Sequence, residues 1–181
     1  MYTRWGRTVC SEESDLMYRG ASGGSGYNTH GGGSNYLCLP NDPEWGVYNE
    51  AVEKVGKLYG AEYKSAYGFS KENSNGKPVN NHDVPCAVCV SRTMRSVVMV
   101  PARLSCYDGW TVEYRGYLMS AHPGHQGRTQ FICVDGSPET EPSGFRDDSG
   151  ALMYHVEAVC GSLPCPPYTP RRELVCVVCS K

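Results

Sequence analysis

The sequence lacks long apolar runs, an excess of basic charge and a signal-peptide core. No apolar run approaches the 18 or so residues of a membrane-spanning helix, so we expect no membrane insertion. The net charge is −2, from 17 Lys and Arg against 19 Asp and Glu, and this balance gives no basic field to attract nucleic acid. The first residues, MYTRWGRTVC, lack the apolar core of a signal peptide. If the protein is secreted, we therefore expect this sequence to be the mature form with the signal removed.

Catalytic and metal-binding motifs are also absent. The chain contains no H-E-x-x-H, Walker or EF-hand spacing, and its five histidines show no spacing typical of metal ligands. GASGG (residues 20–24) matches the G-x-S-x-G string of serine hydrolases, but glycine continues on both sides and no helical pattern follows. A glycine-rich loop is the better interpretation, and we predict that the protein is not an enzyme.

Cysteine and glycine are abundant, with ten and 21 residues. An even, high cysteine count favours disulfides in an oxidising, extracellular compartment over free or zinc-bound thiols. Two C-x-x-C pairs occur, in DVPCAVCV (83–90) and ELVCVVCS (173–180). Their β-branched flanks are typical of a buried strand, in which residues three apart point to opposite faces. Such a pair cannot hold one metal ion, so we predict no zinc, no free thiol and separate disulfides from each pair.

Matching segments indicate that the chain is a duplication. Two pairs of segments align in the same order: CSEESDLMYRG (10–20) with CYDGWTVEYRG (106–116), and HGGGSNYLCLPNDPE (30–44) with HQGRTQFICVDGSPE (125–139). Arg7 and Arg103 both lie three residues before the first cysteine of their series. Because the order of the matches is preserved, we predict two homologous subdomains, 1–92 and 93–181, that form one compact unit.

The duplication sorts the cysteines. Four lie at matching places in each copy: Cys10, Cys38, Cys86 and Cys89 in the first, and Cys106, Cys133, Cys176 and Cys179 in the second. Cys160 and Cys165 have no counterparts, and the GSLP between them suits a tight loop. We therefore expect Cys160 and Cys165 to pair with each other, which leaves two disulfides for each copy.

Short apolar runs between clusters of Gly, Pro, Asn and Ser predict a β-rich fold. NYLCLP, SVVMVPARL, WTVEYRGYLM and TQFICVD read as strands. Helical spacing occurs only in 43–60, where Val47, Ala51, Val55 and Leu58 share a face. The predicted fold class is accordingly β-rich α+β, with ordered loops and disulfide staples.

The tandem copies, the C-x-V-C strand ends and the CGSLPC loop resemble the non-collagenous C-terminal domain of type IV collagen. A closer resemblance is to the C-terminal domains of invertebrate short-chain, spongin-type collagens, carried by GGGSNYLCLPNDPE, GYLMSAH and CGSLPCPPY with the final CVVC. The chain is also similar to galactose-binding lectins of cnidarians. The resemblance implies a tandem duplicated fold of C-type-lectin-like subdomains, as in the non-collagenous domain. It also implies four disulfides: Cys10–Cys89, Cys38–Cys86, Cys106–Cys179 and Cys133–Cys176.

An acidic loop follows the central cysteine of each copy, LPNDPEW (39–45) and VDGSPETE (134–141). Their carboxylates and amides offer the hard oxygens that Ca²⁺ takes, and a partly coordinated Ca²⁺ can complete its shell with two sugar hydroxyls. The candidate calcium ligands are Asp135, Glu139, Asp147, Asp148, Asp42 and Glu44. The candidate sugar contacts are His125, His30, Trp45, Glu141 and Asn41. The alternatives are exposed turns that bind nothing and, for the two histidines, structural hydrogen bonds.

Two functions are consistent with these observations. The first is a secreted, calcium-dependent lectin whose partners are glycans with terminal galactose. The second is a structural module that assembles extracellular matrix. Because weak sugar sites gain from multivalency, we also expect a homo-oligomer, most simply a two-fold dimer.

Overall fold

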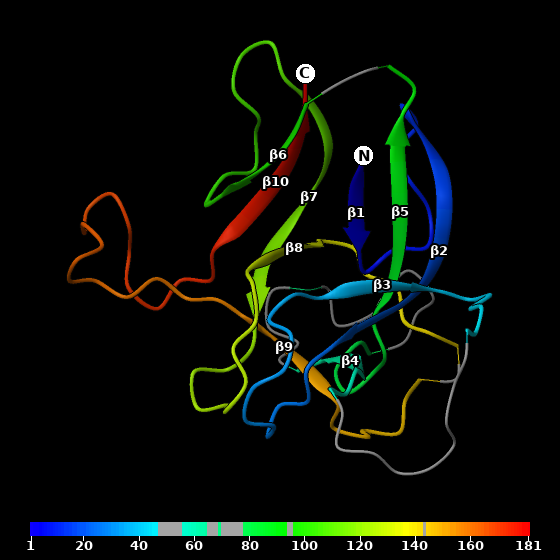
Figure 1. The fold of residues 1–181 in the computed structure, drawn as a ribbon. Coiled ribbons are helices and arrows are strands. Elements are labelled where there is room, and N and C mark those ends of the chain that lie inside the picture. Colours follow the sequence, from blue (N-terminus) through cyan, green and yellow to red (C-terminus); the bar gives the residue numbers. More distant parts are fainter. Residues whose placement is uncertain (47–55, 65–68, 70–77, 94–95, 143) are drawn as a thin grey trace.

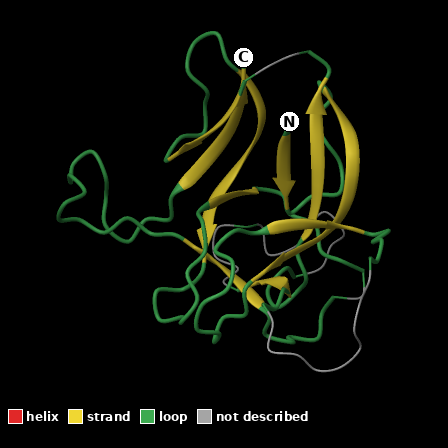
Figure 2. Cartoon of the chain, viewed as in Figure 1, coloured by secondary structure: helices red, strands yellow, loops and turns green. Residues whose placement is uncertain are grey.

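The computed structural model describes residues 1–46, 56–64, 69, 78–93, 96–142 and 144–181. These residues contain strands and no helix (Figures 1 and 2). The strands are β1 (Tyr2–Trp5), β2 (Ser14–Gly24), β3 (Leu37–Pro40), β4 (Tyr59–Tyr63), β5 (Pro85–Ser91), β6 (Val97–Pro101), β7 (Thr111–Ser120), β8 (Ile132–Asp135), β9 (Ala151–His155) and β10 (Val175–Ser180). The described fold is therefore β-rich without the helical part of the α+β expectation, and 47–55, where most of that helix was expected, lie outside the described residues.

The strands form one sheet in the order β6-β10-β7-β8-β1-β5-β2-β4-β9, with β3 paired to β2. The two C-x-x-C segments are interior strands of this sheet, since β5 lies between β1 and β2, and β10 lies between β6 and β7. Both are almost wholly buried, which is the position that their Val-rich sequence predicts. No described helix is long and apolar enough to span a membrane.

All ten cysteines form disulfides, and these include the four bridges that the resemblance implied and the local bridge expected from the GSLP loop. The bridges are Cys10–Cys89, Cys38–Cys86, Cys106–Cys179, Cys133–Cys176 and Cys160–Cys165. The two cysteines of β5 lie in different apolar clusters, Cys86 in one and Cys89 in the other. The prediction that each C-x-x-C sends its sulfurs to opposite faces is confirmed for β5, and no cysteine is free.

The strand pairings of the first half recur in the second. β1–β5, β2–β5, β2–β3 and β2–β4 have the counterparts β6–β10, β7–β10, β7–β8 and β7–β9. A bulge interrupts both long pairings, between Leu16 and Tyr18 in β2 and opposite Val178 and Cys179 in the β10–β7 pair. The sequence matches therefore correspond to matched positions in the sheet.

The glycine of each YRG match is required by the close approach of a paired strand, β3 at Gly20 and β8 at Gly116. A Cβ at Gly20 would overlap the carbonyl oxygen of Leu39, and one at Gly116 would overlap that of Val134. The expected loop at residues 20–24 is thus wrong, because these residues are the end of β2. Small residues there let the backbone of β3 pass close by.

The core is shared by the two halves. One apolar cluster includes Trp5 and Tyr63 from the first half with Met119, Val134 and Met153 from the second. Two parallel contacts join the halves, a bridge between β1 and β8 and the pairing of β4 with β9. The acidic loop after β8, 134–141, lies at the first of these junctions.

Candidate functional site

A hollow of about 610 Å³ lies beside β7 and β8 and is bordered by Arg4 from β1. Its polar lining is two arginines, one carboxylate and one serine, and its apolar lining is aliphatic and tyrosine side chains. The lining residues are Arg4, Leu104, Val112, Tyr114, Arg115, Gly116, Tyr117, Asp135, Gly136, Ser137 and Val175. One predicted site residue, Asp135, is among them.

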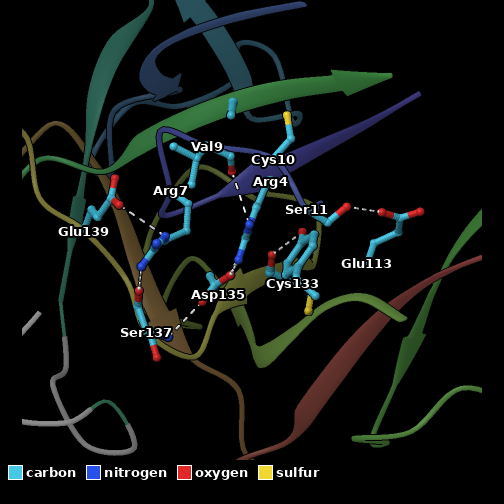
Figure 3. Close-up of polar contacts among 12 residues, drawn as sticks. Arg4, Arg7, Val9, Cys10, Ser11, Glu113, Cys133, Asp135, Ser137 and Glu139 are labelled. Carbon is cyan, nitrogen blue, oxygen red and sulfur yellow. Dashed lines mark hydrogen bonds and ion pairs between the residues drawn. The ribbon is translucent and has the colours of Figure 1, made fainter. Parts of the chain in front are cut away.

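Asp135 is buried and engaged on both of its oxygens. Oδ2 lies 2.7 Å from Arg4 Nη2 and accepts a hydrogen bond from Arg4 Nε at 2.9 Å. Oδ1 accepts a hydrogen bond from the backbone N–H of Ser137 at 2.9 Å. Figure 3 shows Arg4 directed at Asp135 from the β1 segment. The carboxylate is therefore neutralised by a cation of the chain itself, in the role that calcium was expected to fill.

Glu139 holds the turn that follows β1 through hydrogen bonds and an ion pair. Its Oε2 accepts hydrogen bonds from the backbone N–H of Thr8 at 2.9 Å and from Thr8 Oγ1 at 2.7 Å. Its Oε1 lies 3.2 Å from Arg7 Nε (Figure 3). The backbone N–H of Glu139 also donates to the carbonyl of Gly6 at 2.7 Å. Both oxygens thus join the two halves of the chain.

Two buried tyrosines support the same contact between the two halves of the chain. Burial, and after it the Asp135 carboxylate, raises the pKa of both Tyr63 and Tyr114. Both hydroxyls therefore stay protonated and act as donors. Tyr114 donates to the carbonyl of Cys133 at 2.9 Å, and Tyr63 donates to the carbonyl of Glu139 at 2.9 Å.

A buried carboxylate that sequence reasoning missed, Glu113, lies at the other end of β1. Its Oε2 accepts hydrogen bonds from Tyr2 Oη at 3.0 Å, Ser11 Oγ at 2.5 Å and Ser14 Oγ at 3.2 Å. Burial acts to raise the pKa of Glu113, but the hydrogen bonds from Ser11 and its other partners outweigh it and lower that pKa. No sequence signal marks this glutamate, because its partners come from a distant part of the chain.

The other predicted acidic residues are spread over separate surfaces. Asp147 forms an ion pair with Lys64. The pKa of Glu141 is raised, first by its burial and secondly by the charge of Asp83. Asp148 is exposed. The pKa of Asp83 is raised mainly by the burial of Asp83 and secondly by the charge of Asp148. The remaining three, on the loop after β3, are exposed and make no hydrogen bond or ion pair with any described residue: Asn41, Asp42 and Glu44.

The aromatic and histidine side chains predicted to contact sugar do not gather around one carboxylate. Trp45 is 80% exposed, and His30 is exposed in the glycine-rich loop. His125 instead packs in a ring cluster with Tyr27, His122 and Tyr154, at centroid distances of 5.3, 5.5 and 5.4 Å. Burial, and then the charge of His122, lowers the pKa of His125. Its Nδ1 has no hydrogen-bond partner among the described residues, so the structural hydrogen bond considered for this histidine is not made through Nδ1.

No family model matches the chain. Within the described ranges, no group of three or more His, Cys, Asp or Glu side chains is arranged to hold a metal ion. The candidate site therefore rests on the geometry above. Of the predicted residues, Asp135 borders the hollow, Glu139 of the same loop holds the turn after β1, and the rest lie elsewhere.

The arginines are the residues that sequence reasoning undervalued. Arg4 and Arg7 together satisfy Asp135 and Glu139, and Arg115 leaves its guanidinium without a polar partner among the described residues at the hollow. Arg7 carried one signal, its repeat at Arg103. The matching positions of Arg7 and Arg103 indicated a shared structural role, but they did not indicate which carboxylate Arg7 would pair with.

Proposed function

We propose that this chain is a secreted carbohydrate-binding protein and that the hollow beside β7 and β8 receives a sugar. This proposal is carried by the Arg4–Asp135 ion pair at the edge of that hollow, next to Tyr117 and to the Arg115 guanidinium, which has no polar partner among the described residues. Sugar sites combine a few oriented polar groups with an aromatic or aliphatic surface. Groups held by their own ion pair need little reordering on binding, which favours affinity.

The architecture supports the proposal at a coarser level. We propose that 1–92 and 93–181 are tandem C-type-lectin-like repeats of the kind found in the non-collagenous domain, because strand pairings and disulfides recur in both halves. Five disulfides and no free thiol suit an oxidising, extracellular compartment. Fold alone does not specify a ligand, so the hollow carries the functional part.

Terminal galactose is the ligand to test first, and calcium is the variable to test with it. A calcium ion at Asp135 or Glu139 would have to displace Arg4 or Arg7, and a broken pair would leave a charge poorly solvated. We therefore favour sugar binding that does not use these two carboxylates as calcium ligands. The exposed Asp42 and Glu44 remain open to a cation.

The test is calorimetric titration of galactose and a glycan array, each with and without a chelator. We expect binding that survives the chelator and weakens at least tenfold in Arg115→Ala. Arg19→Ala is the matched control, since Arg19 precedes Gly20 as Arg115 precedes Gly116 but does not line the hollow. Equal binding by both variants would place the sugar elsewhere, and complete loss in chelator would restore the calcium mechanism. No glycan bound at all would refute the proposal.

The second candidate is a structural module of extracellular matrix. It is favoured by large apolar side chains that are exposed on the outer strands, including Val98 on β6 and Leu37 on β3. Contiguous exposed apolar patches mark association surfaces, so this candidate predicts that such side chains become buried between chains. A chain that self-associates and binds no glycan would support this candidate over the first.

A further inference from the structure

Lys64, the residue after β4, lies at a contact between the two halves of the chain. β4 pairs in parallel with β9, and the N–H of Lys64 donates to the carbonyl of Met153 at 2.8 Å (Figure 1). The N–H of Asn81 donates to the carbonyl of Tyr63 at 2.8 Å, which places Asn81 alongside Lys64. The Lys64 side chain is only 14% exposed, so the surrounding fold fixes the position of its amine.

The Lys64 amine contacts one amide and two carboxylates. Nζ donates to Asn81 Oδ1 at 2.9 Å, pairs with Asp147 Oδ1, and lies 3.4 Å from Glu62 Oε2. The other oxygen of Asp147, Oδ2, accepts a hydrogen bond from Asn81 Nδ2 at 3.1 Å. One carboxylate therefore touches both the amine of Lys64 and the amide nitrogen of Asn81.

The backbone around this cluster has an uncommon conformation. Five non-glycine residues among the described ones have a left-handed φ, and three of them belong here: Asn81 at +61°, Asp147 at +56° and Ser149 at +55°. Such conformations are uncommon outside glycine and gather at functional sites. The N–H of Ser149 also donates to Glu62 Oε1 at 2.8 Å. The turn before β9 thus holds both carboxylates around Lys64.

We propose that Lys64 and Asn81 join in an intramolecular isopeptide bond, with Asp147 as the catalytic acid and base. A lysine amine is a nucleophile once it has lost its proton. A general acid or base must lie within hydrogen-bond reach of the proton that it moves, and Asp147 meets this condition at both nitrogens. Reactants held side by side in a fold also gain a large effective concentration.

The reaction balances without an oxidant or a further reactant. Asp147 takes a proton from the Lys64 ammonium, and the neutral Nζ attacks Cγ of Asn81. The Nζ–Cγ bond forms and the Cγ–Nδ2 bond breaks, while Asp147 returns its proton to Nδ2 and takes the surplus proton from Nζ. Nδ2 leaves as ammonia and carries that last proton away as ammonium, which restores the carboxylate. Asp147 is 46% exposed, so the ammonia has a route to solvent.

The pH dependence of this reaction follows from the charged groups that face Lys64, which in the described part of the chain are Asp147 and Glu62. Burial acts to lower the pKa of Lys64, but the contacts with these two carboxylates outweigh it and raise that pKa. The hydrogen bond from Lys64 lowers the pKa of Asp147. A neutral amine beside a protonated acid has as many protons as the ion pair does. The rate should therefore be constant around neutral pH and fall both in acid, as Asp147 is protonated, and in alkali, as Lys64 loses its proton to solvent.

The bond would close residues 64–81 into a covalent ring. Because it is an amide, reducing agents that open the five disulfides would leave it intact. None of its residues lines the hollow proposed for sugar. The cross-link and the carbohydrate site are therefore independent.

Mass spectrometry of the intact, disulfide-reduced chain gives the test. We expect a mass about 17 Da below that of the reduced sequence, equal to the ammonia lost. Tandem spectra of a tryptic digest should show a branched peptide that joins Lys64 to Asn81. Lys64→Arg keeps the positive charge but forms no such amide, so it should have its full mass, which separates the cross-link from succinimide formation at an asparagine. Lys57→Arg, at an exposed lysine before β4, is the matched control and should keep the loss.

A time course after oxidative refolding tests the role of Asp147. Asp147→Asn keeps the shape of the side chain and tolerates a left-handed φ, and it should slow the loss of mass at least tenfold while circular dichroism shows the same fold. A wild type with its full mass has only an ion pair here and overturns the proposal. A loss of about 18 Da, the mass of water, would join Lys64 to a carboxylate and overturns the assignment to Asn81. A rate that rises steadily through neutral pH overturns the role of Asp147.

Discussion

Replacing Gly116 with alanine should destabilise the protein far more than an ordinary glycine-to-alanine change. The added Cβ would overlap the carbonyl oxygen of Val134 and would lie 2.7 Å from the nitrogen of Gly136, inside the 3.0 Å that Cβ atoms essentially never cross. Every obstructing atom belongs to the backbone, so no side-chain rotation can relieve the overlap. β8 is also tied to β10 by Cys133–Cys176, which resists the shift that would make room.

Overpacking of this kind costs about 3 kcal/mol of unfolding free energy when the backbone must move. For a chain of this length, each kcal/mol lowers Tm by about 2–4 °C, so Gly116→Ala should lower Tm by about 10 °C. Thermal unfolding followed by tryptophan fluorescence measures this. Gly60→Ala is the matched control, since Gly60 also lies in a strand and has open space at its Cβ. An equal Tm for the two variants would refute the argument that the backbone of β8 leaves no room for a Cβ at position 116.

Two further predictions concern charge and sulfur. Because the folded-state pKa of Glu113 is lowered from its ordinary 4.5, its stabilising effect is complete above that value and is lost as pH falls through the folded-state pKa. Unfolding free energy should therefore fall less steeply with acid in Glu113→Gln than in the wild type, and parallel acid titrations would contradict this. Removing Cys38–Cys86, which spans 48 residues, should cost about 4 kcal/mol in the chain-entropy model, against about 2 kcal/mol for Cys160–Cys165, which spans five. Denaturant unfolding of the two double Cys→Ala variants measures the difference, and the reverse order would show that native-state effects dominate.

The contact between the two halves of the chain, around Asp135 and Glu139, is where the arrangement of charges changes the functional interpretation. Sequence reasoning treated Asp135 and Glu139 as free oxygen donors, and calcium followed from their number. In the fold, Arg4 and Arg7 reach them from β1 and the turn after it, more than a hundred residues earlier in the chain. A carboxylate already paired with a guanidinium gains less from a cation than a free one does, so a calcium ion at this loop would have to compete with Arg4 and Arg7.

The sequence by itself determined the features that depend on local pattern. Val-rich flanks placed both C-x-x-C segments in buried strands, and strand alternation separated their sulfurs. The recurrence of Cys, Tyr, Arg and Gly at fixed offsets indicated matched positions, which the strand register shows for Gly20 and Gly116. Such features are legible because side-chain alternation and glycine contacts act within a few residues or across one strand pair.

Only the tertiary structure decided which distant residues meet. The hydrogen bonds of Glu113, the pairing of Arg4 with Asp135 and the clamp at Glu139 join segments that are about a hundred residues apart or more. The same holds for β1, which meets β8 of the other half, whereas among the described residues β6 pairs only with β10 and β3 only with β2. Arg7 and Arg103 hold the same place before their cysteines, yet Arg7 pairs with a carboxylate of the other half of the chain, whereas the described contacts of Arg103 lie within its own segment. The difference arises because matched positions in the two halves of the sequence face different neighbours once the chain is folded.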